Sequence, residues 1–212
     1  MENPVMIFGA NTVGRTAKAI LEGNDNVVYG FLDDDKTIHG TELDNVQVLG
    51  RTDDDGFLKL IGKKCDAFVA IDDNKVRKTI VKMLHELRKV QPVNAIHRTA
   101  TVEPSAEMGH GNLIDMGVMI GASAKLGNHS LLHMGVSIGA AAELGDWVQV
   151  GQGSVINSGA IIEEDVFVGS GVTIVTGVTI GKGARVGAGS VVIAPVKAGD
   201  TVFGNPAQVV KA

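Results

Sequence analysis

The stretch that decides the fold runs from residue 131 to residue 145 and reads LLHMGVSIGAAAELG. Aliphatic residues recur in it at every sixth position, at Leu132, Ile138 and Leu144. The same step continues in both directions without a miss. The sixteen positions are Val102, Met108, Ile114, Ile120, Leu126, Leu132, Ile138, Leu144, Val150, Ile156, Ile162, Val168, Ile174, Ile180, Val186 and Val192. A fixed period of this kind indicates a repeat architecture.

The six-residue repeat also carries a second track. Two positions before each aliphatic residue after the first stands a small or β-branched residue, or Asn112. One large and one small inward residue per hexad is typical of a left-handed parallel β-helix, in which three hexads close one triangular coil. Residues 18 apart, three hexads on, then stack on one another, and sixteen hexads make about five coils. Glycine often follows the aliphatic residue, and we expect it to relieve turns that need a positive φ.

The first 96 residues lack this period and predict a small Rossmann-like α/β domain. A strand over 5–8 is followed by a glycine turn over 9–14 and a helix over 15–21. The further elements expected are a strand over 27–32, a strand over 67–71, an amphipathic helix over 74–90 and a strand over 93–96. The helix over 74–90 is expected to bury a stripe made of Val76, Ile80, Met83, Leu84 and Leu87. The predicted domains are therefore residues 1–96, Rossmann-like, and residues 97–212, the β-helix.

The glycine turn and the end of the second strand are candidate parts of a nucleotide site. Gly9, Asn11 and Gly14 lie between a strand and a helix, where backbone N–H groups can hold phosphate. Asp33 and Asp34 follow the second strand, where a carboxylate can accept hydrogen bonds from a ribose or a base. Both features also occur as plain turns, so a purely structural role remains open for each.

Composition narrows the class of protein. The chain has 212 residues and a net charge of −5, which does not favour nucleic acid as a partner. Its single cysteine, Cys65, excludes an internal disulfide and predicts a reduced, cytoplasmic thiol. No run approaches the roughly 20 apolar residues of a membrane span, and we expect no signal peptide. Aromatic residues make up only 4% of the chain, which suits the narrow core of a β-helix.

The chain resembles a family of bacterial sugar acetyltransferases. The family includes the sialic acid O-acetyltransferases and the N-acetyltransferase of the UDP-bacillosamine pathway. The segments that carry the resemblance are the hexads and IFGANTVGR (7–15), GFLDDD (30–35), AIDDNKVRKTI (70–80), NAIHRTATVEPSA (94–106) and GNPAQVV (204–210). The resemblance implies a homotrimer, a nucleotide sugar held by the small domain, acetyl-CoA in the crevice between neighbouring β-helices, and a histidine as general base.

Two family positions hold other residues in this chain. The family turn commonly carries histidine before its second glycine, where this chain has Val13. The family base follows an aliphatic hexad position by two residues, and here that position is Ala140, followed by Ala141. His133 is the candidate replacement, because Asp115 stands at the equivalent position of the preceding coil and can orient its imidazole. The alternative is that His133 is a surface residue at a corner of the coil.

Two further residue sets are candidates for a ligand. Gly151, Gly153, Gly169, Gly171 and Gly187 form two columns that would let the pantetheine arm of acetyl-CoA approach the backbone, although β-helix turns also require glycine. His110, His129 and His133 invite comparison with zinc-binding β-helix enzymes. Each stands at a different distance from its aliphatic residue, so the three imidazoles should diverge, and we expect no metal.

Two functions are compatible with these features. The first is acetyl-CoA-dependent acetylation of an amino or hydroxyl group on a free or nucleotide-linked sugar. The second is a non-catalytic relative that binds a nucleotide sugar or CoA, or that serves as a scaffold. Ala140 and Ala141 favour the second function, whereas the intact acidic turn at Asp33 and Asp34 and the unbroken hexads favour the first.

Overall fold

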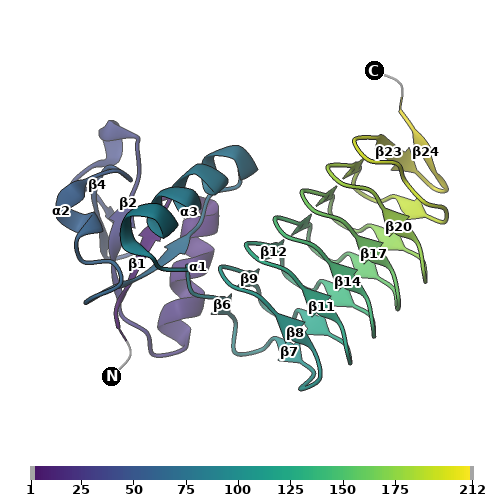
Figure 1. Cartoon of the computed structure of the whole chain (residues 1–212), viewed down its shortest axis with the longest axis horizontal. Helices are drawn as coiled ribbons and strands as arrows, with labels where there is room; N and C mark the ends of the chain where they lie inside the picture. Colours follow the sequence, from purple (N-terminus) through teal and green to yellow (C-terminus); the bar gives the residue numbers. More distant parts are fainter. Residues whose placement is uncertain (1–2, 211–212) are drawn as a thin grey trace. The chain divides into compact units, whose positions relative to one another are not determined.

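The computed structural model describes residues 3–210 and divides the chain into two compact units (Figure 1). The first unit ends at Arg98 and the second begins at Thr99. The first is a small α/β domain and the second is a left-handed parallel β-helix, as the sequence predicts. None of the helices within residues 3–210 is long and apolar enough to span a bilayer.

The N-terminal unit is built on a five-stranded sheet with the order β3-β4-β2-β1-β5. The strands are β1 (Val5–Phe8), β2 (Val28–Leu32), β3 (Glu42–Leu43), β4 (Val46–Gly50) and β5 (Asp66–Val69). Strand β1 pairs in parallel with both β2 and β5, whereas β3 and β4 form an antiparallel hairpin. All four residues of β1 are buried, as expected for a central parallel strand that is covered on both faces. The short strand β6 (Ala95–Ile96) ends this unit.

Two long helices pack on this unit, and each begins at a capping side chain. Helix α1 (Thr12–Gly23) begins earlier than predicted because the side chain of Asn11 accepts a hydrogen bond from the Gly14 N–H. Helix α3 (Asn74–Arg88) begins after Asp73, whose carboxylate accepts from the N–H groups of Lys75 and Val76.

The N-terminal unit contains three short elements that the sequence pattern does not predict. They are the 3-10 helix η1 (Lys36–Ile38), the hairpin formed by β3 and β4, and helix α2 (Asp55–Leu58). The signals for them are local. Asp35 and Asp54 cap η1 and α2, and Asp44 and Asn45 make the hairpin turn with positive φ angles of 49° and 66°. None of these signals repeats along the chain, so hydrophobic periodicity does not predict these elements.

The β-helix consists of two-residue strands, and each of the sixteen predicted aliphatic residues is the second residue of one. The strands are β7 (Thr101–Val102), β8 (Glu107–Met108), β9 (Leu113–Ile114), β10 (Met119–Ile120), β11 (Lys125–Leu126), β12 (Leu131–Leu132), β13 (Ser137–Ile138), β14 (Glu143–Leu144), β15 (Gln149–Val150), β16 (Val155–Ile156), β17 (Ile161–Ile162), β18 (Phe167–Val168), β19 (Thr173–Ile174), β20 (Thr179–Ile180), β21 (Arg185–Val186) and β22 (Val191–Val192). Each strand pairs in parallel with the equivalent strand of the adjacent coil, for example Leu131 with Gln149.

Three parallel sheets form the faces of the prism, and we name each face after one of its strands. The β10 face contains β7, β10, β13, β16, β19 and β22. The β11 face contains β8, β11, β14, β17 and β20, and the β12 face contains β9, β12, β15, β18 and β21. We name the corner that follows each face in the same way. The β12 corner includes 115–117, 133–135 and 151–153, and the β10 corner includes 121–123, 139–141 and 157–159.

Polar residues on the small inward track are fully hydrogen-bonded to the backbone. Asn112 donates to the Gly127 carbonyl and accepts from the Ser130 N–H, at 2.9 and 2.7 Å. Ser154 donates to the Gly169 carbonyl at 2.8 Å and accepts from the Val172 N–H at 3.1 Å. These contacts satisfy buried polar atoms and join successive coils.

The expectation that glycine after the aliphatic residue supplies a positive φ is wrong. Gly139 and Gly151 occupy this position with an ordinary φ, and a Cβ there would meet the backbone of the next coil. Positive φ angles occur two positions later, for example 67° at Gly153. The first column of glycines therefore serves close packing between coils, and only the second serves the turn.

The C-terminal end adds a shortened coil and a cap. Val196 bridges Ile180, and β23 (Thr201–Gly204) pairs with β21 by matching Val202 to Val186. In the regular coils the partners of Ile180 and Val186 would instead stand at positions 198 and 204, so this last coil is shorter than the preceding ones. Strand β24 (Ala207–Val209) then folds back on β23 as an antiparallel hairpin.

Candidate functional site

The glycine turn between β1 and α1 is tightly packed. Gly9 has a φ of 108°, and a Cβ there would lie 2.5 Å from the Ala70 carbonyl oxygen. A Cβ on Gly14 would meet the Gly9 carbonyl oxygen. Both glycines are therefore required by the backbone itself. They hold the first turn of α1 against the carboxyl end of β1, where a phosphate would be placed.

Asp33 joins the two loops at the carboxyl ends of β1 and β2. Its Oδ2 accepts from the Ala10 N–H at 2.8 Å, and its Oδ1 accepts from the Asp35 N–H at 2.9 Å. Each carboxylate oxygen keeps room for a second hydrogen bond. Asp33 therefore shapes the turn, and it can also accept from a ligand.

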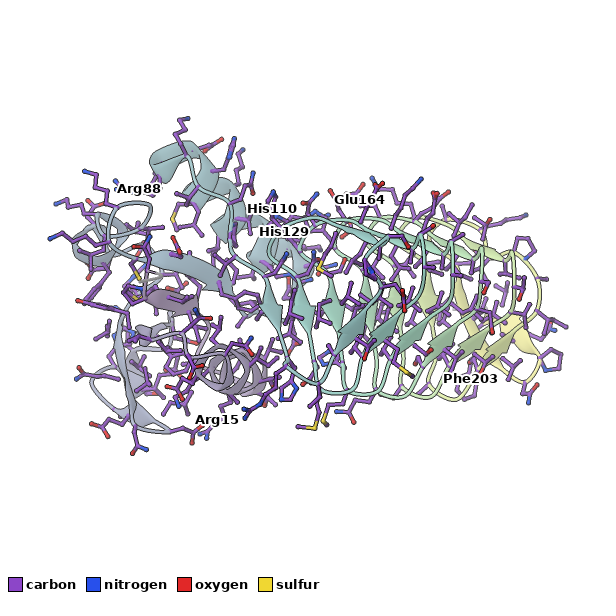
Figure 2. The ribbon with its side chains drawn as sticks, turned by 90° about the horizontal axis from the view of Figure 1, so that it is seen from below. Arg15, Arg88, His110, His129, Glu164 and Phe203 are labelled. Atoms are coloured by element: carbon purple, nitrogen blue, oxygen red, sulfur yellow. The ribbon has the colours of Figure 1, made fainter. Side chains whose placement is uncertain are left out.

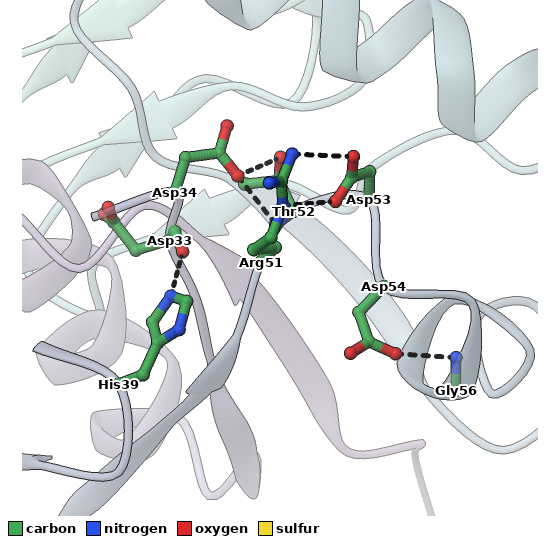
Figure 3. Close-up of polar contacts among 8 residues, drawn as sticks. All are labelled: Asp33, Asp34, His39, Arg51, Thr52, Asp53, Asp54 and Gly56. Carbon is green, nitrogen blue, oxygen red and sulfur yellow. Dashed lines mark hydrogen bonds and ion pairs between the residues drawn. The ribbon is translucent and has the colours of Figure 1, made fainter. Parts of the chain in front are cut away.

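Asp34 and Asp35 differ in what they bind. Asp34 is exposed, and its Oδ1 accepts from the N–H and the hydroxyl of Thr52, at 3.0 and 2.9 Å (Figure 3). Asp35 caps η1, and hydrogen bonds from the Thr37 hydroxyl and N–H lower its pKa. Asp33 and Asp34 are thus brought together at one loop, while Asp35 is committed to the backbone.

Two residues near this loop were missed from the sequence. His39 places its Nε2 2.7 Å from the Asp33 carbonyl oxygen, and Thr52 fixes Asp34 (Figure 3). No motif marks either residue.

At the other side of the turn, Arg15 contacts both carboxylate oxygens of Asp44, at 2.8 and 3.0 Å. Val13, at the position where the family commonly has histidine, is 4% exposed and belongs to the core.

His133 and Asp115 lie in equivalent positions on adjacent coils of the β12 corner. The backbone N–H of His133 donates to the Val150 carbonyl, and the backbone N–H of Asp115 donates to the Leu132 carbonyl, both at 3.0 Å. Asp115 is 8% exposed, and its Oδ1 accepts from the Met116 N–H at 2.7 Å. His133 is half-buried. Adjacent coils are about 4.8 Å apart, which is within reach of an Asp–His pair.

Ala140 and Ala141 lie at the β10 corner, one corner further along the chain than His133. Both are exposed. Ala141 has a φ of 53°, the left-handed conformation that glycine adopts at Gly159 in the next coil. In one chain, therefore, His133 and the alanine at the family position for the base lie on opposite edges of the β10 face.

The five candidate glycines for acetyl-CoA all lie at the β12 corner. Gly151, Gly169 and Gly187 stand where a Cβ would meet the adjacent backbone or the Phe203 ring. Gly153 and Gly171 have φ angles of 67° and 66°, and a Cβ there would meet open space. The β-helix accounts for each of these glycines. At the same corner the exposed side chains of Gln152, Ser170 and Ala188 stand between these glycines, so a pantetheine arm would have to pass alongside them.

The remaining histidines do not assemble into a metal site. His110 and His129 share the β11 corner, where the His129 N–H donates to the His110 carbonyl (Figure 2). His129 is buried and stacks on Trp147 with ring centroids 4.3 Å apart. Within residues 3–210 no group of three or more His, Cys, Asp or Glu side chains is placed to hold a metal ion. Burial raises the pKa of the Cys65 thiol to about 11, so this residue is unreactive near neutral pH.

Two family models match the chain. The PglD N-terminal domain matches residues 4–84, and the bacterial transferase hexapeptide model, which spans six repeats, matches residues 159–194. No protein with a curated description matches the chain by sequence.

Several solved structures are similar to the chain over its whole length. One is a single-residue variant of perosamine N-acetyltransferase from Caulobacter crescentus in complex with CoA and GDP-perosamine. It is 28% identical, has a TM-score of 0.91, and the match covers 100% of this chain and 99% of that chain. WeeI from Acinetobacter baumannii AYE is 26% identical with a TM-score of 0.87, covering 99% and 100%. The acetyltransferase domain of PglB from Neisseria gonorrhoeae FA1090, in complex with acetyl coenzyme A, shares the fold at 23% identity, with a TM-score of 0.90 and coverage of 99% and 100%.

Proposed function

The chain belongs to the bacterial hexapeptide-repeat sugar acetyltransferases that carry a PglD-type N-terminal domain, and from this we propose what it does. It transfers the acetyl group of acetyl-CoA to an amino or hydroxyl group of a nucleotide-linked sugar. The observation that carries this function is the full-length similarity to an N-acetyltransferase bound to CoA and GDP-perosamine. Acetyl-CoA is a cytoplasmic metabolite, so we place the reaction in the cytoplasm.

The nucleotide is assigned to the N-terminal unit. The N–H groups at the start of α1 would hold the phosphates, while Asp33 and Asp34 would accept hydrogen bonds from the ribose or base. The glycines that fix this turn and the pairing of Asp34 with Thr52 support the assignment. Free carboxylate lone pairs are suited to the N–H and O–H donors of a nucleoside rather than to its phosphates.

The reaction needs an acceptor, a thioester and a base. The lone pair of the sugar amine or hydroxyl attacks the thioester carbonyl carbon, the C–S bond breaks, and the sulfur leaves as a thiolate, to which the base returns the proton taken from the acceptor. The base takes the proton that the acceptor loses, which contributes about 10²–10⁴-fold to the rate. We assign this role to His133, with Asp115 as the residue that orients its imidazole. Alanine at position 140 has no atom that can take a proton.

For His133 to serve the site at Ala140, a second copy of the chain is needed. The β12 corner with His133 and the β10 corner with Ala140 are the two edges of the β10 face. If three β10 faces surround a threefold axis, the β12 corner of one copy meets the β10 corner of the next. His133 of one chain would then reach the crevice where the neighbouring chain has Ala140 in place of the family base.

The outer surface of the β10 face supports this homotrimer. Its outward residues are uncharged, namely Thr101, Met119, Ser137, Val155, Thr173 and Val191. Met119 is 51% exposed, and Met116 and Met134 on the adjoining corner are 51% and 43% exposed. By contrast, the β11 face carries an ion pair between Lys125 and Glu143 at 2.9 Å. Three of these six outward residues are apolar, and an uncharged face flanked by exposed methionines favours an interface between subunits.

One experiment tests the base directly. His133→Asn is expected to lower acetyl transfer to an amino sugar nucleotide by about 10²–10⁴-fold, with little change in the affinity for acetyl-CoA. Transfer rates and calorimetric titration with acetyl-CoA provide the two measurements, and GDP-, UDP- and CMP-linked amino sugars form the acceptor panel. If the variant kept full activity, His133 would not be the base, and alignment of a neutral amine with the thioester would remain as the mechanism.

The second candidate function is binding without transfer. The exposed Ala140 and Ala141 favour it, since they leave the β10 corner without a titratable side chain at these positions. A protein that binds CoA and a nucleotide sugar in calorimetry, but transfers no acetyl group to any member of the panel, would establish this function in place of the first.

A further inference from the structure

The positive charge of the chain is concentrated in the N-terminal unit. Nine of the 19 lysines and arginines lie in two segments, 59–64 and 74–89, which together contain a single acidic residue, Glu86. The chain as a whole has a net charge of −5, so the rest of the molecule is strongly acidic. The basic residues are Lys59, Lys63, Lys64, Lys75, Arg77, Lys78, Lys82, Arg88 and Lys89.

Hydrogen bonds join these two segments into one surface. The Arg88 guanidinium donates to the Ile61 carbonyl at 3.0 and 3.1 Å and to the Lys59 carbonyl at 3.1 Å. Gly62 makes room for Val90, because a Cβ on Gly62 would lie 2.5 Å from a Val90 methyl group. The exposed lysines nearest this junction in the chain are Lys59, Lys63, Lys64 and Lys89, which we call the basic surface, while Lys82, earlier on α3, pairs with Glu86 at 3.8 Å. Figure 2 shows long side chains pointing outward around Arg88.

Helix α3 has an exposed apolar side chain near each of its ends, and Leu87 is the one that lies beside these lysines. Val76 and Leu87 belong to the stripe of α3 that was expected to be buried, but they are 44% and 61% exposed. The expectation is therefore wrong for these two residues, whereas Ile80 and Leu84 are buried as expected. An exposed apolar side chain beside a basic surface, as at Leu87, is typical of segments that lie on a membrane surface.

The basic surface lies at the opposite edge of the sheet from the glycine turn. The segment 59–64 precedes the first residue of β5, while Gly9 follows the last residue of β1, and these two strands are parallel. A partner that covers the basic surface therefore leaves the Gly9–Gly14 turn open.

We infer that the basic surface docks the protein on a bilayer that contains anionic lipid. The charge favours an anionic partner, and the exposed Leu87 favours lipid over nucleic acid. Acyl chains accept apolar side chains, whereas a sugar–phosphate backbone gives them no contact. Attraction between exposed lysines and anionic headgroups falls off within a Debye length, so docking is reversible and sensitive to salt.

Vesicle sedimentation of the full chain tests this docking. The protein should sediment with phosphatidylcholine vesicles that contain phosphatidylglycerol, remain in solution with phosphatidylcholine alone, and be released by high salt. Lys63→Glu with Lys64→Glu should weaken binding by more than about twenty-fold, because each lysine near such a surface contributes about five-fold. Lys36→Glu with Lys197→Glu changes the net charge equally at exposed sites elsewhere and should have a much smaller effect.

A second variant separates lipid from other polyanions. Leu87→Gln keeps every charge and should weaken binding to the anionic vesicles, while binding to polyuridylate stays unchanged. The inference is overturned if the anionic vesicles are not bound, if both charge variants weaken binding equally, or if Leu87→Gln has no effect on vesicle binding. Thermal unfolding of each variant confirms that the N-terminal unit is folded. Acetyl transfer is not measured, so the outcome is independent of the proposed reaction.

Discussion

At the scale of single residues, the two glycine columns of the β-helix predict opposite sensitivities to the same substitution. Gly139→Ala places a methyl group against the backbone of the next coil, 2.8 Å from the Asn157 carbonyl carbon and 2.9 Å from the Ser158 Cα. Backbone atoms cannot move aside, so we expect the free energy of unfolding to fall by about 3 kcal/mol.

Gly159→Ala is the matched control, because Gly159 has a φ of 65° and open space around it. Only the left-handed conformation opposes a side chain there, at a cost of about 1 kcal/mol. Ala141 already bears this cost at a φ of 53°. Denaturant unfolding of the two variants provides the comparison, and equal losses of stability would contradict the assignment of different roles to the two columns.

Residues of the candidate site were predictable only where a pattern reports them. Gly9 and Asp33 follow predicted strands, so their positions could be read from the chain. The six-residue step likewise placed His133 and Ala140 on successive corners. Thr52 and His39 escaped detection because their contacts join irregular loops, where neither period nor motif fixes which residues meet.

At the scale of elements, the contacts of Asp33 predict that its substitution weakens ligand binding by the N-terminal unit and leaves the β-helix unchanged. Asp33→Ala removes the acceptor for the Ala10 and Asp35 N–H groups and frees both loops of the proposed nucleotide site. We expect affinity for the nucleotide sugar to fall at least about ten-fold, while affinity for acetyl-CoA stays unchanged. Calorimetric titration of each ligand measures both. A parallel loss of acetyl-CoA binding would show that the variant had damaged more than this unit.

Helix α3 offers a test by pH, because it is capped by a carboxylate. Hydrogen bonds from the N–H groups of Val76 and Lys75 lower the pKa of Asp73 below its ordinary value of 3.8. A carboxyl whose pKa is lowered by folding contributes stability above the unfolded pKa, and this contribution is lost as the pH falls through the folded pKa. Asp73→Ala should therefore lower the unfolding temperature at neutral pH, and the difference from the parent should shrink in acid.

Asp73→Ser supplies the control for this prediction. A serine hydroxyl can cap the helix but does not titrate in acid. This variant should therefore remain closer to the parent than Asp73→Ala at neutral pH and keep its cap in acid. A gap between Asp73→Ala and the parent that is the same at neutral and acid pH would rule out a titrating cap.

The β-helix was predictable as an element because its sixteen strands repeat one environment, so each aliphatic residue reports the same contact. The prediction stops at Val192 for a physical reason. The last coil is shorter, since Ile180 bridges Val196 rather than position 198, and the period of the aliphatic residues is broken there. The exposure of Leu87 was not predicted for a related reason. Helical spacing marks an apolar stripe but does not show how much of the stripe is covered by other residues.

At the scale of the whole molecule, the proposed active site would be shared between two copies of the chain. If His133 serves the crevice at Ala140 of the next copy, each site takes one edge from each of two chains. His133→Asn then removes the base from one edge, and Ala140→Trp fills the crevice at the other. Homotrimers of either variant alone should be inactive, for different reasons.

Mixing these two variants before assembly gives the decisive result. A site is active only when its β12 corner comes from an Ala140→Trp chain and its β10 corner from a His133→Asn chain, which random mixing in equal amounts produces at about a quarter of the interfaces. Acetyl transfer should therefore recover to about a quarter of the parent rate. Native mass spectrometry checks that mixed trimers have formed. Mixed trimers without activity would mean that His133 acts within its own chain or not at all, since a site shared between two chains must regain both intact edges at some of the mixed interfaces.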